Sequence, residues 1–205
     1  MKVIPLFSQS WESNSFLLIH EGKALLIDAG AAPQRVTEAL SESDATLVGI
    51  ALTHGHFDHI LSMDKLRDLF GVPVYLHKAD AEMPSDSEQN AYEVFFGAQK
   101  CWRPADRLLN DGDSIPFGDK SLTVISTPGH TEGSVCYLTD DILFSGDTVF
   151  AGGVGRTDLY GGDMGALGQS LKKILSLPGH LTVYAGHGGS TTLRNIANNL
   201  MSNFE

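Results

Sequence analysis

Cysteine is scarce in this chain of 205 residues, which holds only Cys101 and Cys136. The two cysteines lie far apart in the sequence and form no CxxC pair, which argues against a cysteine-based metal site or a small disulfide-stapled fold. We expect two packed thiols in a reducing compartment, and neither lies in a motif that marks it as a nucleophile. A single disulfide between them stays open at this point.

Long apolar runs are also missing, since none is long enough to cross a bilayer. The first ten residues hold one lysine and are interrupted by Pro5, so they do not resemble a signal peptide. Cations are few as well, because 14 Lys and Arg stand against 25 Asp and Glu for a net charge of -11. That charge would repel nucleic-acid phosphates. We therefore predict a cytoplasmic protein with a small-molecule substrate and no nucleic-acid or membrane partner, while the oligomeric state stays open.

The chain is rich enough in apolar residues for one large core, at 42%, and no linker divides it. We predict a single domain over residues 1–205. Alternating and helical spacings predict strands at 2–7, 16–20, 24–27, 47–52, 72–76, 122–126, 135–138, 142–144 and 181–185, and helices at 33–40, 59–70, 88–96, after Asp163 and after Thr191 or Thr192. The strands form two groups, each followed by helices, which indicates an α+β fold with two sheets face to face and helices outside.

The segment 78–107 is polar, aromatic and irregular, apart from its predicted helix. It either covers one edge of a site, as binding loops often do, or fills the surface. Six aromatic side chains are candidates for an apolar substrate wall, with ordinary packing as the alternative for each: Tyr92, Phe95, Phe96, Trp102, Phe150 and Tyr160.

A dense run of metal-ligand residue types follows the apolar stretch 47–52. The segment Thr53–His59 places His54, His56, Asp58 and His59 directly after this predicted strand. Imidazole and carboxylate are ligands that zinc and iron prefer. Side chains two residues apart point the same way in an extended segment, so His54 and His56 suit one ion. Asp58 and His59 lie where the chain turns into a helix and suit a second ion nearby.

Three further residues follow later strands, each next to a glycine: His130, Asp147 and His187. We predict that His130 completes the first metal site and His187 the second. Asp147 is predicted to bridge them, because its charge separates two cations. The cofactors are predicted to be two divalent ions, zinc first, with iron or manganese as alternatives. The remaining histidines, His20, His77 and His180, are expected to be ordinary hydrogen-bonding residues.

Five motifs together resemble the metallo-β-lactamase-fold hydrolases: the stretches 26–30, 53–59, 128–131, 145–148 and 185–188. The segment 155–163 is similar to that of the hydroxyacylglutathione hydrolases (glyoxalase II) and their short relatives, and sulfur dioxygenases share a similar segment. The resemblance implies a four-layer αββα sandwich with a binuclear site at one edge of the sheets. It implies that His54, His56 and His130 hold one metal, that Asp58, His59 and His187 hold the other, and that Asp147 bridges them. Asp28 is implied to orient the ligand loop.

The expected activity is hydrolysis of a small ester or thioester by a metal-bridging hydroxide, with Asp58 as the catalytic residue that orients it. Two alternatives stay open: a mononuclear iron sulfur dioxygenase acting on a persulfide, and a non-catalytic metal-binding protein. The Gly186–Gly188 turn favours the two-metal hydrolase, because the dioxygenases usually lack it. Glyoxalase II enzymes continue past their last histidine into a region that grips glutathione, whereas this chain stops at Glu205. Whether the substrate contains glutathione therefore stays open.

Overall fold

Two six-stranded sheets form the centre of the computed structural model, which describes residues 1–7 and 11–202. The first sheet has the order β1-β2-β3-β4-β5-β6 and the second β14-β13-β10-β9-β8-β7. The first comprises β1 (Lys2–Leu6), β2 (Ser15–His20), β3 (Lys23–Ile27), β4 (Thr46–Ala51), β5 (Val74–His77) and β6 (Arg107–Leu109). The second comprises β7 (Ser114–Phe117), β8 (Lys120–Ser126), β9 (Val135–Thr139), β10 (Ile142–Gly146), β13 (Thr182–Ala185) and β14 (Thr191–Thr192). A small ribbon pairs β11 (Val149–Phe150) with β12 (Gly153–Val154).

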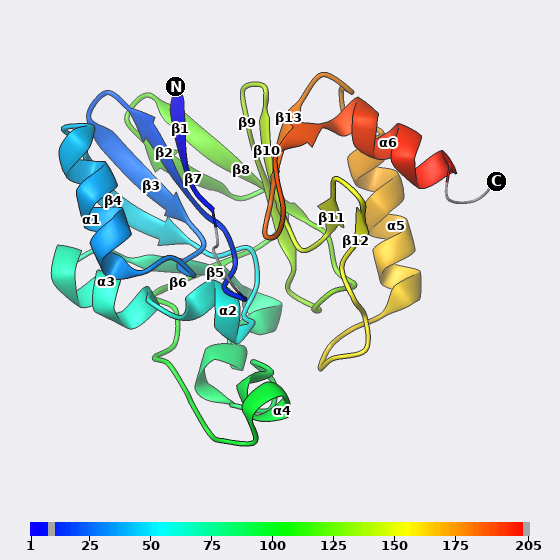
Figure 1. Cartoon of the computed structure of the whole chain (residues 1–205), viewed down its shortest axis with the longest axis horizontal. Coiled ribbons are helices and arrows are strands. Elements are labelled where there is room, and N and C mark those ends of the chain that lie inside the picture. The colour runs from blue at the N-terminus through cyan, green and yellow to red at the C-terminus, as the bar shows by residue number, and fades with distance from the viewer. Residues whose placement is uncertain (8–10, 203–205) are drawn as a thin grey trace.

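The sheets face each other, and helices cover their outer sides (Figure 1). Helices α1 (Pro33–Glu42) and α3 (Met63–Phe70) cover the first sheet, and α5 (Met164–Leu175) and α6 (Leu193–Ser202) cover the second. Strand β2 shows why four layers form, because its side chains alternate between two cores. Leu17 and Ile19 pack under α1 and α3, whereas Phe16 and Leu18 pack between the sheets. The predicted αββα sandwich is confirmed.

The sequence-based boundaries are wrong in several places. The helix predicted over 59–70 is two helices, α2 (Phe57–Ile60) and α3, because the chain bends at Leu61 and Ser62. Strands β6 and β7 were not predicted, since each has only three or four residues. The predicted strand 72–76 is β5 at 74–77, and the loop after β10 contains the β11–β12 ribbon.

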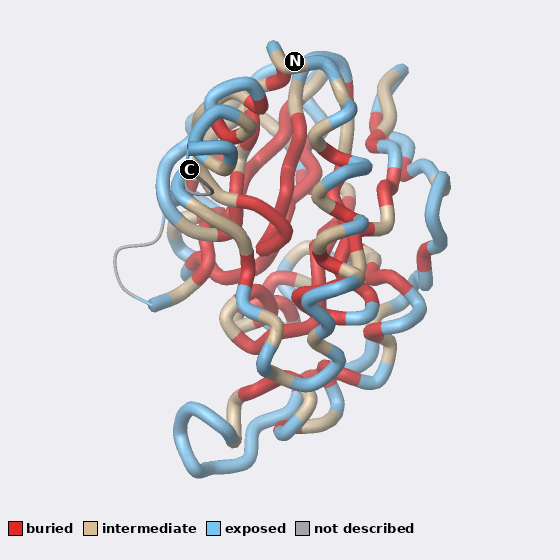
Figure 2. Tube along the Cα trace, turned by 90° about the vertical axis from the view of Figure 1, so that its right-hand side faces the viewer, coloured by how far each residue is buried: buried red, intermediate tan, exposed pale blue. Residues whose placement is uncertain are grey.

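The segment between β5 and β6 protrudes below the sandwich (Figure 1). It holds the short 3-10 turns η1 (Lys78–Asp80) and η2 (Met83–Ser85) and the helix α4 (Tyr92–Phe96), which is shorter than the predicted 88–96. Figure 2 shows buried residues concentrated in the interior of the molecule and exposed chain at its lower end. No helix among residues 1–7 and 11–202 is long and apolar enough to span a membrane.

Candidate metal centre

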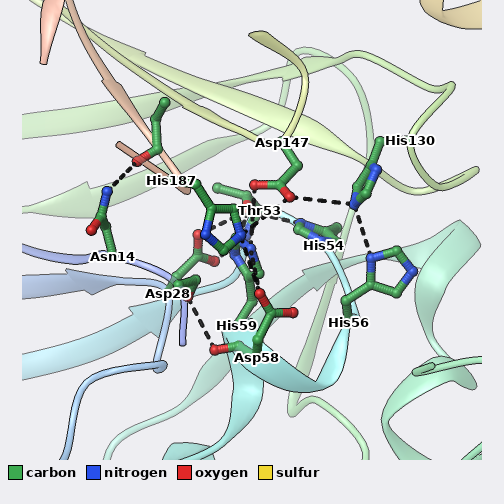
Figure 3. A network of polar contacts seen from close by, with 12 residues as sticks. Asn14, Asp28, Thr53, His54, His56, Asp58, His59, His130, Asp147 and His187 are labelled. Atoms are coloured by element: carbon green, nitrogen blue, oxygen red, sulfur yellow. Dashed lines mark hydrogen bonds and ion pairs between the residues drawn. The ribbon is translucent and has the colours of Figure 1, made fainter. Parts of the chain in front are cut away.

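The predicted ligands converge at the edge where strands of both sheets end (Figure 3). The turn after β4 carries His54 and His56, and helix α2, which follows it, carries Asp58 and His59. His130 follows β8, Asp147 follows β10, and His187 follows β13. Strand ends in a packed sandwich are rigid, so these side chains are held close together by the fold itself. The sandwich therefore brings all seven predicted ligands into one cluster.

The first ligand group is His54, His56 and His130, whose ligand nitrogens all lie within 4.8 Å of one another. All three side chains are buried. His130 Nδ1 lies 2.7 Å from the Arg156 carbonyl oxygen, which fixes the proton on Nδ1 and turns Nε2 toward the cluster. Burial lowers the pKa of all three imidazoles, that of His56 to about 3, and neighbouring imidazoles add to the effect at His54 and His56. This group therefore consists of neutral imidazoles, the form that binds a metal.

The second ligand group is Asp58, His59 and His187, with ligand atoms again within 4.8 Å of one another. His187 Nε2 lies 3.2 Å and His59 Nε2 3.7 Å from Asp58 Oδ2. Burial alone would lower the pKa of His59, but the carboxylates of Asp28, Asp58 and Asp147 outweigh it and raise the pKa well above its ordinary value. At His187 burial again lowers the pKa, but the hydrogen bond with Asp58 and the charges of Asp147 and Asp58 together outweigh it and raise the pKa. This group is a cluster of opposite charges when no metal is bound.

Asp147 joins the two groups. Its Oδ1 lies 3.3 Å from His59 Nε2, and its Oδ2 lies 3.5 Å from the Nε2 atoms of both His130 and His187. A Cβ at Gly186 would collide with the Asp147 carboxylate and the His59 ring, so only glycine permits this approach. A carboxylate whose oxygens reach histidines of both groups has the placement that a bridging ligand needs.

The donor atoms themselves indicate whether metal ions fit this cluster. In the described part of the chain, four buried side-chain atoms of this cluster make no hydrogen bond: His54 Nε2, His56 Nε2, His59 Nε2 and Asp147 Oδ1, of which the last two face each other as an ion pair at 3.3 Å. A buried polar atom without a partner costs about 1–3 kcal/mol, so four in one place call for a ligand. Imidazole nitrogens and carboxylate oxygens are donors that zinc and iron accept. The residues present therefore fit two divalent ions.

Asp28 fixes the orientation of the second group. Its carboxylate accepts hydrogen bonds from the Thr53 amide at 2.7 Å, the Thr53 hydroxyl at 2.8 Å and His59 Nδ1 at 2.8 Å. His59 is thereby held with Nε2 facing the cluster, the arrangement by which carboxylates orient metal-binding histidines. Asp28 reaches this position in a left-handed turn, with a φ of 56°, at the end of β3.

A family model supplies the decisive comparison. Residues 10–187 of this chain match the model of the metallo-beta-lactamase superfamily. The chain belongs to the metallo-beta-lactamase superfamily. Among curated relatives, a probable metallo-hydrolase of Bacillus subtilis, YqgX, is 37% identical over 183 residues, which are 88% of this chain and 87% of the relative. The probable polyketide biosynthesis zinc-dependent hydrolase BaeB of Bacillus velezensis is 31% identical, over 90% of this chain and 76% of BaeB.

Solved structures of the superfamily superpose closely on this chain. The B3 metallo-beta-lactamase BLEG-1 matches with a TM-score of 0.90 and 35% identity, over 96% of this chain and 97% of its own. A di-iron-bound form of TTHA1623 matches with a TM-score of 0.84 and 34% identity, over 96% of this chain and 98% of its own. The relatives include a probable metallo-hydrolase, and those described with a metal differ in it, since BaeB is described as zinc-dependent and TTHA1623 was solved with two irons.

Three residues that the sequence analysis missed hold the ligand turns of this superfamily member in place. Ser13 Oγ donates to the Asp58 carbonyl oxygen at 3.1 Å, and Asn14 Nδ2 donates to the Gly188 carbonyl oxygen at 2.9 Å. Both lie between β1 and β2 and so fasten the second group. No motif distinguishes them in the sequence, because polar residues between strands usually form ordinary turns.

The third missed residue is Asp80, which is buried in η1. Its carboxylate accepts hydrogen bonds from the Gly55 amide at 3.0 Å, the Thr131 hydroxyl at 2.8 Å and the Gly133 amide at 2.7 Å. Burial raises the pKa of Asp80 to about 6, although these hydrogen bonds oppose the rise. Asp80 thus connects the turn of His54 with the turn of His130 and supports the first group.

A cavity of about 550 Å³ opens beside the metal centre. It is lined mostly by apolar side chains and by five ligands: Trp11, His56, Phe57, Asp58, Ala91, Phe95, Phe96, His130, Asp147, Phe150, Gly155, Arg156, Leu159 and His187. Three of the six predicted wall aromatics, Phe95, Phe96 and Phe150, are in this lining. Tyr92 and Trp102 pack behind it instead, with Trp102 buried in the core under the first sheet. Tyr160 is exposed and is not part of the lining, so the prediction was wrong for these three. The segment 78–107 therefore covers one edge of the site.

The other predictions on single residues have mixed outcomes. His20, His77 and His180 are hydrogen-bonded outside the centre, as predicted, to Asp119, Ser126 and Asp141 respectively. Cys136 is buried as predicted, whereas Cys101 is exposed, so the expectation of packing was wrong there. Both thiols are free, which closes the possibility of a disulfide between them.

Proposed function

We propose that this superfamily member is a binuclear metal-dependent hydrolase of a small ester or thioester. The observation that carries the proposal is the sharing of Asp147 between two complete ligand groups. The apolar cavity beside those groups supports it, because small-molecule sites are concave, largely apolar and hold a few convergent polar groups. The cytoplasmic location expected from the sequence belongs to the same proposal, and cell fractionation tests it.

The seven ligands would hold two divalent ions, zinc first, with iron or manganese as alternatives. Ions bound there supply a polarised carbonyl and a water acidic enough to attack at neutral pH. The relatives support both leading choices, since BaeB is described as zinc-dependent and TTHA1623 was solved with two irons. The metal is therefore proposed from the donor set, with zinc preferred for a mixture of imidazoles and carboxylates.

Within this centre we assign the catalytic role to Asp58. It lines the cavity, and its side chain is 14% exposed, so it meets both the ligand group and incoming substrate. Its pKa is lowered despite burial, chiefly by His59, so the carboxylate stays charged and accepts a hydrogen bond from the attacking water. The thiols offer no competing nucleophile, because burial raises the pKa of Cys136 to about 11 and Cys101 does not line the cavity.

The deciding experiment is elemental analysis of protein purified without chelators or immobilised-metal columns, followed by assays on the same preparation. We expect about two equivalents of metal per chain and hydrolysis of S-acetyl-N-acetylcysteamine. One equivalent of iron with oxygen consumption on glutathione persulfide would instead identify the sulfur dioxygenase. Two equivalents with no turnover of any ester or thioester would favour a metal-binding protein without catalysis.

The likeness to BLEG-1 favours one second candidate, hydrolysis of a β-lactam. The same preparation is therefore assayed with nitrocefin. Turnover of nitrocefin above that of all thioesters would move the assignment from thioesterase to lactamase, with the metal centre unchanged.

A further inference from the structure

Four aromatic side chains form one wall of the cavity. The Phe57 ring is the centre of this wall, since the rings of Trp11, Phe95 and Phe96 lie 5.5–5.7 Å from it between centroids. Three of the four are about half exposed, with Trp11 at 51%, Phe95 at 52% and Phe96 at 48%. Large aromatic groups that gather at a surface without being covered mark a binding site.

Apolar surface reaches the metal ligands from two sides. Phe57 immediately precedes Asp58 in the chain, and both line the cavity. On the second sheet's side, the Phe150 ring lies 6.1 Å from the His187 ring. A carbonyl held at the ligand groups would therefore carry its nearest substituent between aromatic surfaces.

Positive charge is almost absent from this lining. Among the described residues that line the cavity, Arg156 is the only lysine or arginine. Asp158 binds its guanidinium through two hydrogen bonds, of 2.6 and 2.7 Å, and Arg156 lies over the Phe95 ring at 5.6 Å. Glutathione carries two carboxylates, and the cavity offers them no cation that is not already paired.

We propose that the reacting carbonyl carries an uncharged aromatic or branched apolar group, and that thioesters of this class are preferred over S-lactoylglutathione. This inference rests on the proposed hydrolase function. It names the substrate class, because burial against an apolar wall stabilises the binding of an apolar acyl group. Polar hydroxyacyl and glutathionyl groups would lose hydration there without gaining hydrogen-bond or charge partners.

Matched thioesters test the preference. S-phenylacetyl-N-acetylcysteamine and S-acetyl-N-acetylcysteamine differ only in the apolar ring, and S-D-lactoylglutathione supplies the polar comparison. We expect kcat/KM for the phenylacetyl compound to exceed the acetyl value by about 10–100-fold, the range a well-filled apolar pocket provides. We expect S-D-lactoylglutathione to fall below the phenylacetyl compound.

Variants on one helix then connect the preference to the wall. Phe96→Ala is expected to lower the phenylacetyl-to-acetyl ratio by about fivefold or more, whereas Phe96→Leu retains most of it. Val94→Ala is the matched control, because Val94 lies on the same helix, is 60% exposed and is not part of the cavity lining. An unchanged ratio in Phe96→Ala, with normal metal content and circular dichroism, would overturn the inference.

Binding without turnover gives an independent measure. Trp11 lies in the wall, so phenylacetate is expected to change the tryptophan fluorescence of the wild-type protein at lower concentration than acetate or lactate does. The Trp11→Phe variant should lose this signal while Trp102 remains.

The outcomes separate the two proposals. If the acetyl and lactoyl thioesters are cleaved as well as the phenylacetyl compound, the substrate class is wrong and the hydrolase function stands. If no thioester, ester or nitrocefin is cleaved, the hydrolase function fails. In that case the fluorescence titrations decide the apolar preference. Equal half-saturation concentrations for phenylacetate and lactate overturn it, and a lower half-saturation concentration for phenylacetate upholds it.

Discussion

The two ligand groups of the centre differ in their access to water. His54, His56 and His130 are all buried, whereas the side chains of Asp58 and His187 are 14% and 39% exposed. Both groups line the cavity, the first through His56 and His130 and the second through Asp58 and His187, but only the second has side chains that are substantially exposed. Two sites joined by one carboxylate are therefore expected to behave differently toward solvent, protons and chelators.

Charge sharpens the contrast. The first group contains imidazoles whose pKa values are lowered by burial, so they are neutral before any metal arrives. In the second group, carboxylates raise the pKa values of His59 and His187, so metal binding there must release protons. A protein can therefore prepare one ion's site by desolvation and the neighbouring site by charge pairing.

The largest effect on metal content and activity is expected from replacing Asp147, the residue that both ligand groups share. Asp147→Asn removes the charge that lies between both groups, and we expect metal content to fall to one equivalent or less and kcat/KM to fall by at least about a thousandfold. Elemental analysis and the thioester assay measure the two effects. Asp141→Asn is the control, because Asp141 is exposed and pairs with His180 away from the centre. Full activity with two metals in Asp147→Asn would refute the bridging assignment.

A smaller effect is expected from loosening the second group alone. Asp28→Asn replaces the acceptor that orients His59, and loss of such a partner weakens metal binding by about 10–100-fold. Competition with a chromogenic chelator should show one weakened equivalent and one unchanged. Equal weakening of both equivalents would show that Asp28 supports the whole centre.

The first group has its own support, and its loss is expected to be milder. Asp80→Asn retains one oxygen acceptor but no longer satisfies the Gly55 and Gly133 amides together. We expect about tenfold weaker binding at the first group, and the same chelator competition measures it. If Asp80→Asn weakens only the same metal ion that Asp28→Asn weakens, the two carboxylates do not support separate ligand groups.

We expect acid to release the metal ions of the two ligand groups at different pH values. A raised pKa keeps His59 and His187 protonated up to a higher pH, so protons displace their metal first as the pH falls. The lowered pKa values of His54 and His56 delay release from the first group. We expect two release steps about one pH unit or more apart, followed as metal retained on gel filtration. The His187→Ala variant should keep only the lower-pH step, and a single step in the wild type would go against the comparison.

The sequence predicted which residues converge at the candidate centre better than it predicted the residues that hold them in place. The run from His54 to His59 was readable because metal chemistry requires particular residue types within a few positions. The four layers were predictable as well, because strand and helix periodicities distribute apolar residues over a long stretch.

The residues that hold the ligand groups in place could not be predicted from the sequence, for a physical reason. Asp80 bonds to amides 25 and 53 residues away along the chain, and Asn14 to a carbonyl 174 residues away. Such long-range partners leave no local pattern, and neither residue belongs to a motif. The split between α2 and α3 was missed because both helices continue one apolar stripe.

The order of the sheets has a consequence for assembly. Strands β1–β6 build one sheet and β7–β14 belong to the other half, so the chain divides near residues 110–113 into two consecutive halves. The first half carries His54, His56, Asp58 and His59, and the second carries His130, Asp147 and His187. Neither half holds a complete ligand group. Two fragments cut at that turn are therefore expected to reassociate more tightly when metal is present. The metal ions would then join the two halves of the chain as well as supply the chemistry.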